Sequence, residues 1–382
     1  MNSQFTTPLI ASILILGLIG ILPIFNEASA LNVKICDDET ISTGIFQNIQ
    51  VAEGKSCTIT GDTIIEKNLT ADGAIDVIVD GAPLVVIGGN VVIKNSQFVS
   101  VENSQIDKNL ILKNNSGDDI IVTFNQIGKN LILKENIAKE PPLVNSKFIK
   151  IENNQVGRDL ILIDNLADDD FFTQQNTIAG NLIQRGTTVE NNDIFVVDNT
   201  IGGNLNFKDN SSSGGETDIW RNNISGNVLL KSNSFGEVGS IQDNVVQGKF
   251  IIKDHGLEDY SRMSFSNNSI GKDLNIIKNT QRSIDVSGSI VGGDIKIIKN
   301  HSEGFSVGQN EANGKIVVKK NIVEPFLGGS QGILFFNNIS SEKIIISDNV
   351  VESDLFCRDN VPDPTGKKNI VGGSKLEQCN SL

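Results

Sequence analysis

The chain has 382 residues, a formal net charge of −14 at pH 7 and a sequence pI near 4.7, with 36 glycines but only one tryptophan and one tyrosine. Nucleic-acid binding is disfavoured, because it calls for basic patches with interleaved aromatic side chains. The length alone would permit two or three domains, but the internal repeats described below favour one elongated body built from stacked units.

The first 30 residues form a separate segment. The apolar run PLIASILILGLIGILPIF is followed by NEASA, in which Ala28-Ser29-Ala30 has the small-x-small form of a signal-peptidase site. No Lys or Arg precedes the run, and the alternative is an uncleaved N-terminal anchor, which would be the only membrane contact. Either interpretation predicts that the rest of the chain is exported and is secreted or held at the cell surface.

A short phrase recurs along the body of the chain. It reads NQIGKNLILKENI from residue 125, NQVGRDLILIDNL from 154, NTIGGNLNFKDNS from 199 and NSIGKDLNIIKNT from 268. After the glycine comes a short turn and then a stretch that alternates apolar and polar residues, as in Leu131 and Leu133, which predicts a strand with one buried face. A second short strand precedes the next copy.

Units of about 22 residues with two or three short strands are typical of the coils of a parallel β-helix. Leucine-rich repeats share the period, but they need a helical half, whereas the second half here is β and rich in Asn. The sequence resembles the right-handed parallel β-helix (pectin-lyase-like) superfamily over roughly residues 60–350; the resemblance is architectural and implies no activity. We therefore predict an all-β, right-handed parallel β-helix solenoid over 64–351, with an N-terminal cap at 31–63 and a C-terminal cap at 352–382.

The four cysteines lie near the two ends of the chain. In an oxidising compartment their placement predicts the disulfides Cys36–Cys57 and Cys357–Cys379, which staple the ends, because the other pairings would join opposite ends of a long array. Seven Asn-x-Ser/Thr sequons also agree with export and predict a glycoprotein: Asn68, Asn114, Asn210, Asn223, Asn267, Asn300 and Asn338.

Two series of Asn recur once per coil. We expect their side chains to hydrogen-bond from coil to coil and to adopt the left-handed conformation that corners need. His255 falls in the second series and is predicted to be a corner residue, and departures from the period predict loops at 138–147, 167–175 and 322–332. The first series is Asn125, Asn154, Asn176, Asn199, Asn222, Asn244, Asn268, Asn310 and Asn337, and the second is Asn115, Asn136, Asn165, Asn210, Asn233, Asn279, Asn300 and Asn321.

Catalysis is the alternative function. Asp168, Asp169 and Asp170 could serve a polysaccharide lyase or glycoside hydrolase, or bind Ca²⁺, although a solvated acidic loop is the simpler interpretation. Arg221, beside the only tryptophan, is the candidate base. An acidic pair and a His-Gly one coil apart, the polygalacturonase pattern, is missing because His255 lies about four coils from the aspartates. We therefore assign no catalytic residue, no metal and no cofactor.

The main strand of each coil has two outward positions. The first is often apolar and the second is mostly basic, and stacking would place successive members about 4.8 Å apart. Such a face could bind an acidic polysaccharide or another surface protein, and the alternative is that adjacent acidic residues simply balance solvated lysines. We predict an exported structural and binding protein that acts by multivalent adhesion, with an inert envelope spacer as a further alternative. The candidate row is Lys113, Lys134, Arg185, Lys208, Lys231 and Lys253, and Ile replaces the basic residue in three other coils.

Overall fold

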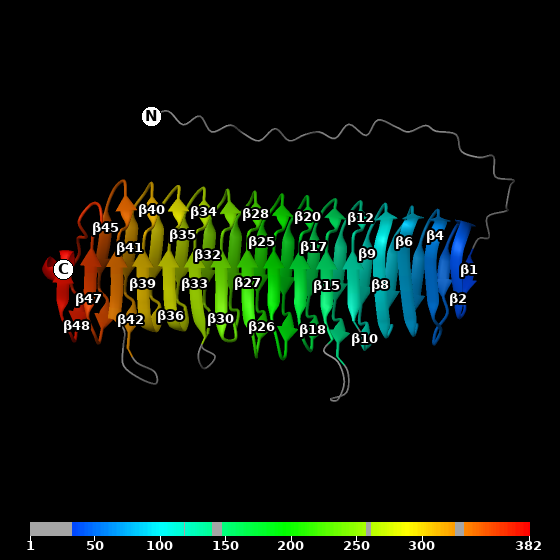
Figure 1. Ribbon diagram of the computed structural model, residues 1–382, viewed down its shortest axis with the longest axis horizontal. Helices are drawn as coiled ribbons and strands as arrows, with labels where there is room; N and C mark the ends of the chain where they lie inside the picture. Colours follow the sequence, from blue (N-terminus) through cyan, green and yellow to red (C-terminus); the bar gives the residue numbers. More distant parts are fainter. Residues whose placement is uncertain (1–32, 118, 140–146, 257–260, 325–331) are drawn as a thin grey trace, which may run out of the picture. The chain divides into compact units, whose positions relative to one another are not determined.

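The computed structural model describes residues 33–382 except 118, 140–146, 257–260 and 325–331. These residues form a parallel β-solenoid with coils of about 22 residues, so the predicted all-β architecture is confirmed (Figure 1). All named strand pairs are parallel, and each strand pairs with its equivalents one coil before and after it, for example Lys208 with Lys231 and Lys231 with Lys253. Within the described residues no helix is long and apolar enough to cross a membrane.

Sheet A contains the main strand of each coil. Its 15 strands, in spatial order, are β1 (Lys34–Cys36), β3 (Ile49–Val51), β5 (Leu69–Asp72), β7 (Val91–Lys94), β9 (Leu110–Lys113), β13 (Leu131–Lys134), β17 (Leu160–Ile163), β21 (Leu182–Arg185), β25 (Leu205–Lys208), β29 (Val228–Lys231), β32 (Phe250–Lys253), β35 (Leu274–Ile277), β38 (Ile295–Ile298), β41 (Ile316–Lys319) and β45 (Ile344–Ser347).

Sheet B contains the return strand of each coil. Its longer strands are β2 (Glu39–Phe46), β4 (Cys57–Ile65), β6 (Asp76–Ile87), β8 (Phe98–Ile106), β11 (Ile120–Thr123), β15 (Ile149–Glu152), β19 (Phe171–Gln174), β23 (Ile194–Val197), β27 (Glu216–Trp220), β30 (Val238–Gln242), β33 (Arg262–Ser266), β36 (Thr280–Ser287), β39 (His301–Gly308), β43 (Gly332–Phe336), β47 (Leu355–Arg358) and β49 (Lys375–Glu377).

Two-residue strands complete the coils. Those joined to sheet B are β12 (Gln126–Ile127), β16 (Gln155–Val156), β20 (Thr177–Ile178), β24 (Thr200–Ile201), β28 (Asn223–Ile224), β31 (Val245–Val246), β34 (Ser269–Ile270), β37 (Ile290–Val291), β40 (Glu311–Ala312), β42 (Ile322–Val323), β44 (Ile339–Ser340), β46 (Val350–Val351) and β48 (Ile370–Val371). Sheet C consists of β10 (Ser116–Gly117), β14 (Ile137–Ala138), β18 (Leu166–Ala167), β22 (Thr188–Val189) and β26 (Ser211–Ser212).

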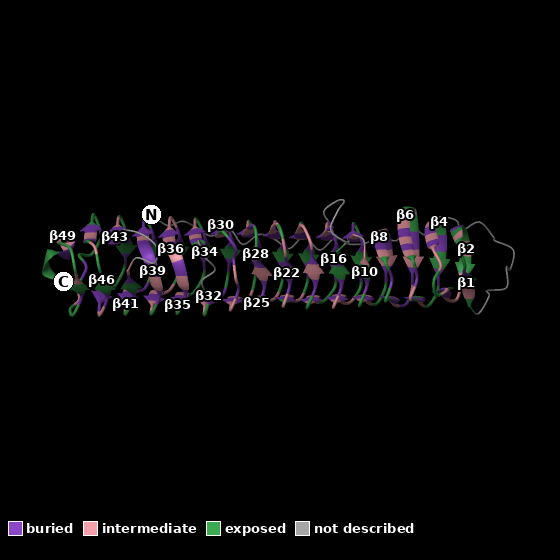
Figure 2. Cartoon of the chain, turned by 90° about the horizontal axis from the view of Figure 1, so that it is seen from below, coloured by how far each residue is buried: buried purple, intermediate pink, exposed green. Residues whose placement is uncertain are grey.

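The core is a continuous apolar column inside the coils. Along β13, Leu131 and Leu133 are fully buried while Ile132 and Lys134 are half-buried, and the same alternation repeats in the neighbouring strands. The predicted in–out phase of sheet A is therefore correct. In Figure 2, β25, β32, β35 and β41 follow the lower edge and β30, β36 and β43 the upper, so sheets A and B face opposite sides of the solenoid.

The stacked Asn side chains form hydrogen-bonded ladders. The Asn199 side-chain nitrogen donates to the Asn222 side-chain oxygen (3.0 Å) and to the Thr173 carbonyl (2.8 Å), and the Asn199 side-chain oxygen accepts from the Asn176 backbone (3.0 Å). All members of both predicted series are buried except Asn337. A third ladder, half-buried, includes Asn68, Asn90, Asn109, Asn130, Asp159, Asn181 and Asn204.

The corner conformation differs from the prediction. The residue with positive φ is the one before the buried Asn, as for Asp198 (φ 57) before Asn199, and the Asn itself satisfies the backbone groups that the bend leaves unpaired. Asn337 also has positive φ, and Asn338 occupies the ladder, so the prediction for Asn337 was wrong by one position. The cause is Ser340, which takes the inward place held by Ile, Val or Ala in other coils.

The stretch 167–175 is not a loop. Ala167 ends β18, and Phe171–Gln174 forms β19, which pairs with β15 and β23 in full register. The extra acidic residues fit in a corner without lengthening the coil. Most of the other two predicted loops, 138–147 and 322–332, lies outside the described residues.

Both predicted disulfides are present. Cys36–Cys57 joins the first two coils and Cys357–Cys379 the last ones, and all four residues are buried. Strands extend into both segments predicted as caps. At the N-terminal end β1 and β2 pair with β3 and β4, and at the C-terminal end β47 pairs with β49.

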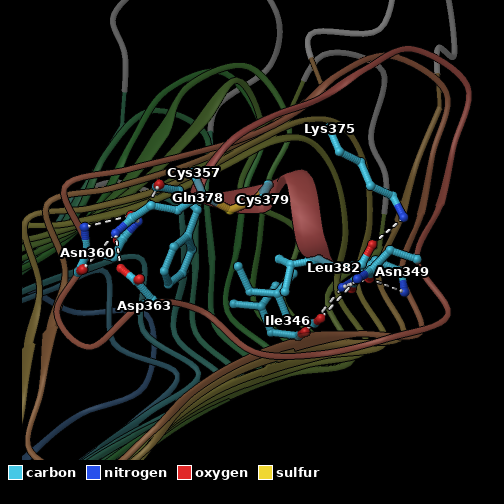
Figure 3. Close-up of a disulfide and its surroundings, with 12 residues drawn as sticks. Ile346, Asn349, Cys357, Asn360, Asp363, Lys375, Gln378, Cys379 and Leu382 are labelled. Carbon is cyan, nitrogen blue, oxygen red and sulfur yellow. Dashed lines mark hydrogen bonds between the residues drawn. A yellow bond between two sulfur atoms is a disulfide. The ribbon is translucent and has the colours of Figure 1, made fainter.

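A short 3₁₀ helix, η1 (Gln378–Ser381), lies across the C-terminal end (Figure 3). The Gln378 side-chain oxygen accepts from the backbone and side-chain nitrogens of Asn360 (2.9 and 3.1 Å), so it ends the first Asn ladder. Lys375 donates to the Leu382 carbonyl, and Leu382 is almost fully buried. This segment covers groups that would otherwise form an open sheet edge.

We predict that Leu133→Asp prevents folding whereas Ile132→Asp costs far less, because only the first places an unpaired charge inside the core. Circular dichroism melts of the two variants check this. Equal loss of stability in both would contradict the phase of sheet A.

The adjacent residues Asn222 and Asn223 give a second matched pair. Asn222→Ala removes the hydrogen bonds to Val196 (2.7 Å) and Asn244 (3.0 Å) and leaves the backbone amide of Asn199 without an acceptor. We therefore expect the free energy of unfolding to fall by an amount on the order of 3 kcal/mol. Asn223 is exposed, and Asn223→Ala should change the free energy of unfolding by less than about 0.5 kcal/mol. Urea unfolding of both variants measures the difference.

Candidate functional site

The predicted basic residues lie in one register row on the outer face of sheet A. Each member of the row pairs with its equivalent in the next coil. The row runs Lys94, Lys113, Lys134, Ile163, Arg185, Lys208, Lys231, Lys253, Ile277, Ile298 and Lys319.

Acidic neighbours neutralise one half of this row more than the other. Glu135 lies 3.8 Å from Lys113 and 3.1 Å from Lys134, and Asp209 lies 3.4 Å from Arg185. Among the described residues, Lys208, Lys231 and Lys253 have no carboxylate within 4.0 Å. We call these three residues the free lysine row.

The basic edge continues where the row itself contains Ile. Lys278 and Lys299, which follow Ile277 and Ile298, are exposed corner residues with positive φ. Lys319 and Lys320 follow in the next coil. The sequence analysis missed this continuation because the charge moves one residue along the chain, out of the alternating strand pattern.

An apolar row lies two residues before the basic row. Ile183, Leu229 and Ile251 are half-buried on the outer face, and Asn206 interrupts them. Basic and apolar side chains therefore lie side by side over several coils on a sheet with no described element covering it.

The residues considered for catalysis are not brought together. The Asp168 and Asp169 carboxylates accept hydrogen bonds from Asn191 (2.7 Å) and Asn192 (3.0 Å). Arg221 makes two bonds to Asp198, at 2.7 and 2.8 Å, at the far end of the sheet B strands. Asp170 precedes β19 whereas Arg221 follows β27, which separates them by about five strand residues or roughly 15 Å along the strand direction.

A second charged surface, on sheet B, was not foreseen. Asp170, Asp193 and Glu216 occupy equivalent positions at the start of three successive strands, and we call them the acidic column. The Asp170 carboxylate accepts from the Asp193 backbone (3.2 Å), and the Asp193 carboxylate accepts from the Glu216 backbone (2.6 Å). Among the described residues, none of the three has a cationic side chain within 4.0 Å.

Aromatic rings lie beside the acidic column. Phe172 and Phe195 stack in parallel on the outer face with centroids 5.1 Å apart, and Phe148 meets Phe172 edge-on. Asp218 occupies the next place in this row, as the register partner of Phe195. The signal was present in the sequence, since DDFF and NDIF each place a Phe two residues after an Asp, but recognising it required the phase of sheet B.

Asp218 is the most perturbed carboxyl of this surface. It is 4% exposed, and within the described structure one of its carboxyl oxygens has no hydrogen-bond partner. Burial raises the pKa of Asp218 to about 7, and Glu216 and Asp193 act in the same direction. Burial also raises the pKa of Asp170 to about 6, with Asp169 and Asp193 contributing.

His255 is a corner residue, as predicted. Its backbone amide donates to Asn279 (3.2 Å) and its ring packs against Phe235 with centroids 4.5 Å apart. Burial lowers the pKa of His255 to about 4, so the ring is neutral at physiological pH. An enclosed neutral imidazole in the Asn ladder has no access to a substrate.

Small hollows occur on the described surface. One of about 200 Å³ on sheet B is lined by Asp285, Ser306 and Leu334, and another of about 160 Å³ by Arg262, Arg282 and Glu303. No group of three or more His, Cys, Asp or Glu side chains in the described part of the chain is arranged to hold a metal ion.

The sequons divide by burial. Asn210, Asn300 and Asn338 are buried ladder members, so a glycan could not be attached to them in the folded protein. Asn114, Asn223 and Asn267 are exposed, and their glycosylation remains a prediction.

Comparisons with protein-family models, with curated proteins and with solved structures found no match. The parallel β-solenoid is therefore the level at which the fold is assigned.

The raised pKa of Asp218 predicts that the stability of the folded protein depends on pH. Its folded value, about 7, lies above its ordinary value of 3.8, so the folded state binds a proton more tightly and stability is lost as pH rises between these values. Asp218→Asn should therefore be more stable than the parent by a few kcal/mol at about pH 8, and the difference should vanish near pH 4. Urea unfolding across this pH range measures it, and a constant difference would contradict the assignment.

Proposed function

We propose that this protein is an exported binding protein that engages an anionic polymer, such as an acidic polysaccharide, along the basic edge of sheet A. The proposal rests on the free lysine row, three cations in consecutive coils that have no acidic partner among the described residues. Multivalent contact suits this geometry, because each coil adds a similar weak site and a polymer can engage several at once.

The apolar row supports the same function. Leu229 and Ile251 lie next to Lys231 and Lys253, so a bound chain could place its anionic groups on the lysines and its less polar faces on the aliphatic side chains. The exposed Lys278 and Lys299 extend the edge toward the C-terminal end.

Export is part of the proposal. Two disulfides suit an oxidising compartment, and 31–382 carries no free cysteine. The resemblance to the pectin-lyase-like superfamily enters only as architecture, and nothing in the arrangement of Asp168, Asp169 and Arg221 favours a lyase or hydrolase over a binder.

The triple variant Lys208→Gln, Lys231→Gln, Lys253→Gln should lose most of the parent's retention on an immobilised acidic polysaccharide, with a melting temperature nearly unchanged. Retention of the parent should fall steeply with salt, since charges are screened over about 10 Å at 0.1 M.

The matched control replaces Lys108, Lys129 and Lys272 with Gln. These side chains lie at the turns before sheet A, so the control has the same net charge as the test variant but keeps the row. Equal losses in both variants would mean that net charge alone is responsible, and no salt-sensitive retention by the parent would favour an inert spacer.

A further inference from the structure

The acidic column of sheet B and the free lysine row of sheet A have the same spacing. Each places one charge per coil in three consecutive coils, at the strand separation of about 4.8 Å. Both sets lack a partner of opposite charge within 4.0 Å among the described residues. A rigid row of cations and a rigid row of anions with one common period can pair at every coil.

The flanking rows lie at the same distance from the two charged rows. On sheet A the apolar row lies two residues before the lysines, and on sheet B the aromatic row lies two residues after the carboxylates. Both offsets amount to about 6.6 Å along a strand. When the charges are paired in order, Leu229 corresponds to Phe195, whereas Asn206 corresponds to Phe172 and Ile251 to Asp218.

Strand direction determines whether these features can face one another. Sheets A and B lie on opposite sides of the solenoid (Figure 2), and because each coil is a closed circuit, their strands run in opposite directions. If a second copy is displaced sideways without rotation, its sheet B faces sheet A of the first with antiparallel strands. In that arrangement the lysines meet the carboxylates, and Leu229 in the flanking row meets Phe195.

We propose that a second copy of this chain docks its acidic column on the free lysine row, so that solenoids associate side by side with parallel axes. An axial stagger of two coils brings Lys208, Lys231 and Lys253 opposite Asp170, Asp193 and Glu216. The contact is heterologous, so each copy keeps one unused face and the association continues into an open array.

The buried carboxyl of Asp218 supports an occupant for this surface. Among the described residues one of its oxygens has no hydrogen-bond partner, and Glu216 and Asp193 lie close enough to disfavour its charge. A lysine amine of the second copy placed beside Phe195 would donate a hydrogen bond to the Asp218 carboxylate and contact the face of the Phe195 ring. An organic cation fits better than a metal ion, since no described group of side chains here has metal-binding geometry.

The test uses two neutralised variants of the full chain. One carries Lys208→Gln, Lys231→Gln and Lys253→Gln, and the other carries Asp170→Asn, Asp193→Asn and Glu216→Gln. Asn can keep the backbone hydrogen bonds that Asp170 and Asp193 accept, as it does in the neighbouring ladders. Each variant retains one intact face.

Sedimentation velocity at low salt should show concentration-dependent association of the parent, weakened at least tenfold in either variant alone. An equimolar mixture of the two variants should form a one-to-one dimer and nothing larger, because only one complementary contact is left. A monomeric parent at low salt, unchanged association in either variant, or no dimer in the mixture would overturn the proposal.

The proposal uses the same lysine row as the proposed function but does not depend on polymer binding. The acidic-column variant keeps that row and should be retained on an acidic polysaccharide like the parent. Loss of self-association with intact retention therefore separates the two, and added polysaccharide should compete with association of the parent.

Discussion

The structure depends on the hydrogen bonds of the Asn ladders. A coil of about 22 residues must bend sharply several times, and each bend breaks the regular pairing of backbone groups between coils. The Asn side chains replace those bonds: the Asn154 side chain donates to Val122 and Asn176 and accepts from Asn125. Without them each corner would bury unpaired amides at a cost of about 1–3 kcal/mol.

The ladders also permit a costly backbone conformation. Residues such as Asp198 and Arg221 hold positive φ although they carry side chains, which is unfavourable by roughly 1–2 kcal/mol for each. The Asn that follows hydrogen-bonds to the coils on both sides, and these bonds stabilise the strained backbone conformation. The side chain at the position with positive φ is exposed or half-buried and is free to vary, which is why the position contains Asp, Lys, Arg, Gln and Asn in different coils.

The sequence predicted the positions of residues that follow the regular repeat, and the predictions failed where the repeat is irregular. Both Asn series, the buried Leu131 and Leu133 and the register of Lys208, Lys231 and Lys253 follow from counting along the repeat. Asn337 was assigned to the ladder in place of Asn338 because Ser340 replaces the apolar residue on which the coils were aligned. The acidic column was missed because sheet B strands begin after corners of variable length, so their phase cannot be counted from the glycine.

The outward rows are informative because the fold does not require them. An inward position must be apolar, and a ladder position must be Asn or a close substitute, whereas an outward position accepts many residues. Three lysines in adjacent coils repel one another, by about 1 kcal/mol at 4 Å even in water, and Thr or Ser would avoid that cost. The carboxylates of the acidic column also lie one coil apart on the opposite face, and Asp193 adds to the rise that burial causes in the pKa of Asp170. Solvation alone would favour placing charges of opposite sign next to one another, as at Lys134 and Glu135. Segregating cations on sheet A and anions on sheet B opposes the stability of an isolated solenoid, and it becomes favourable when something outside the chain neutralises each row.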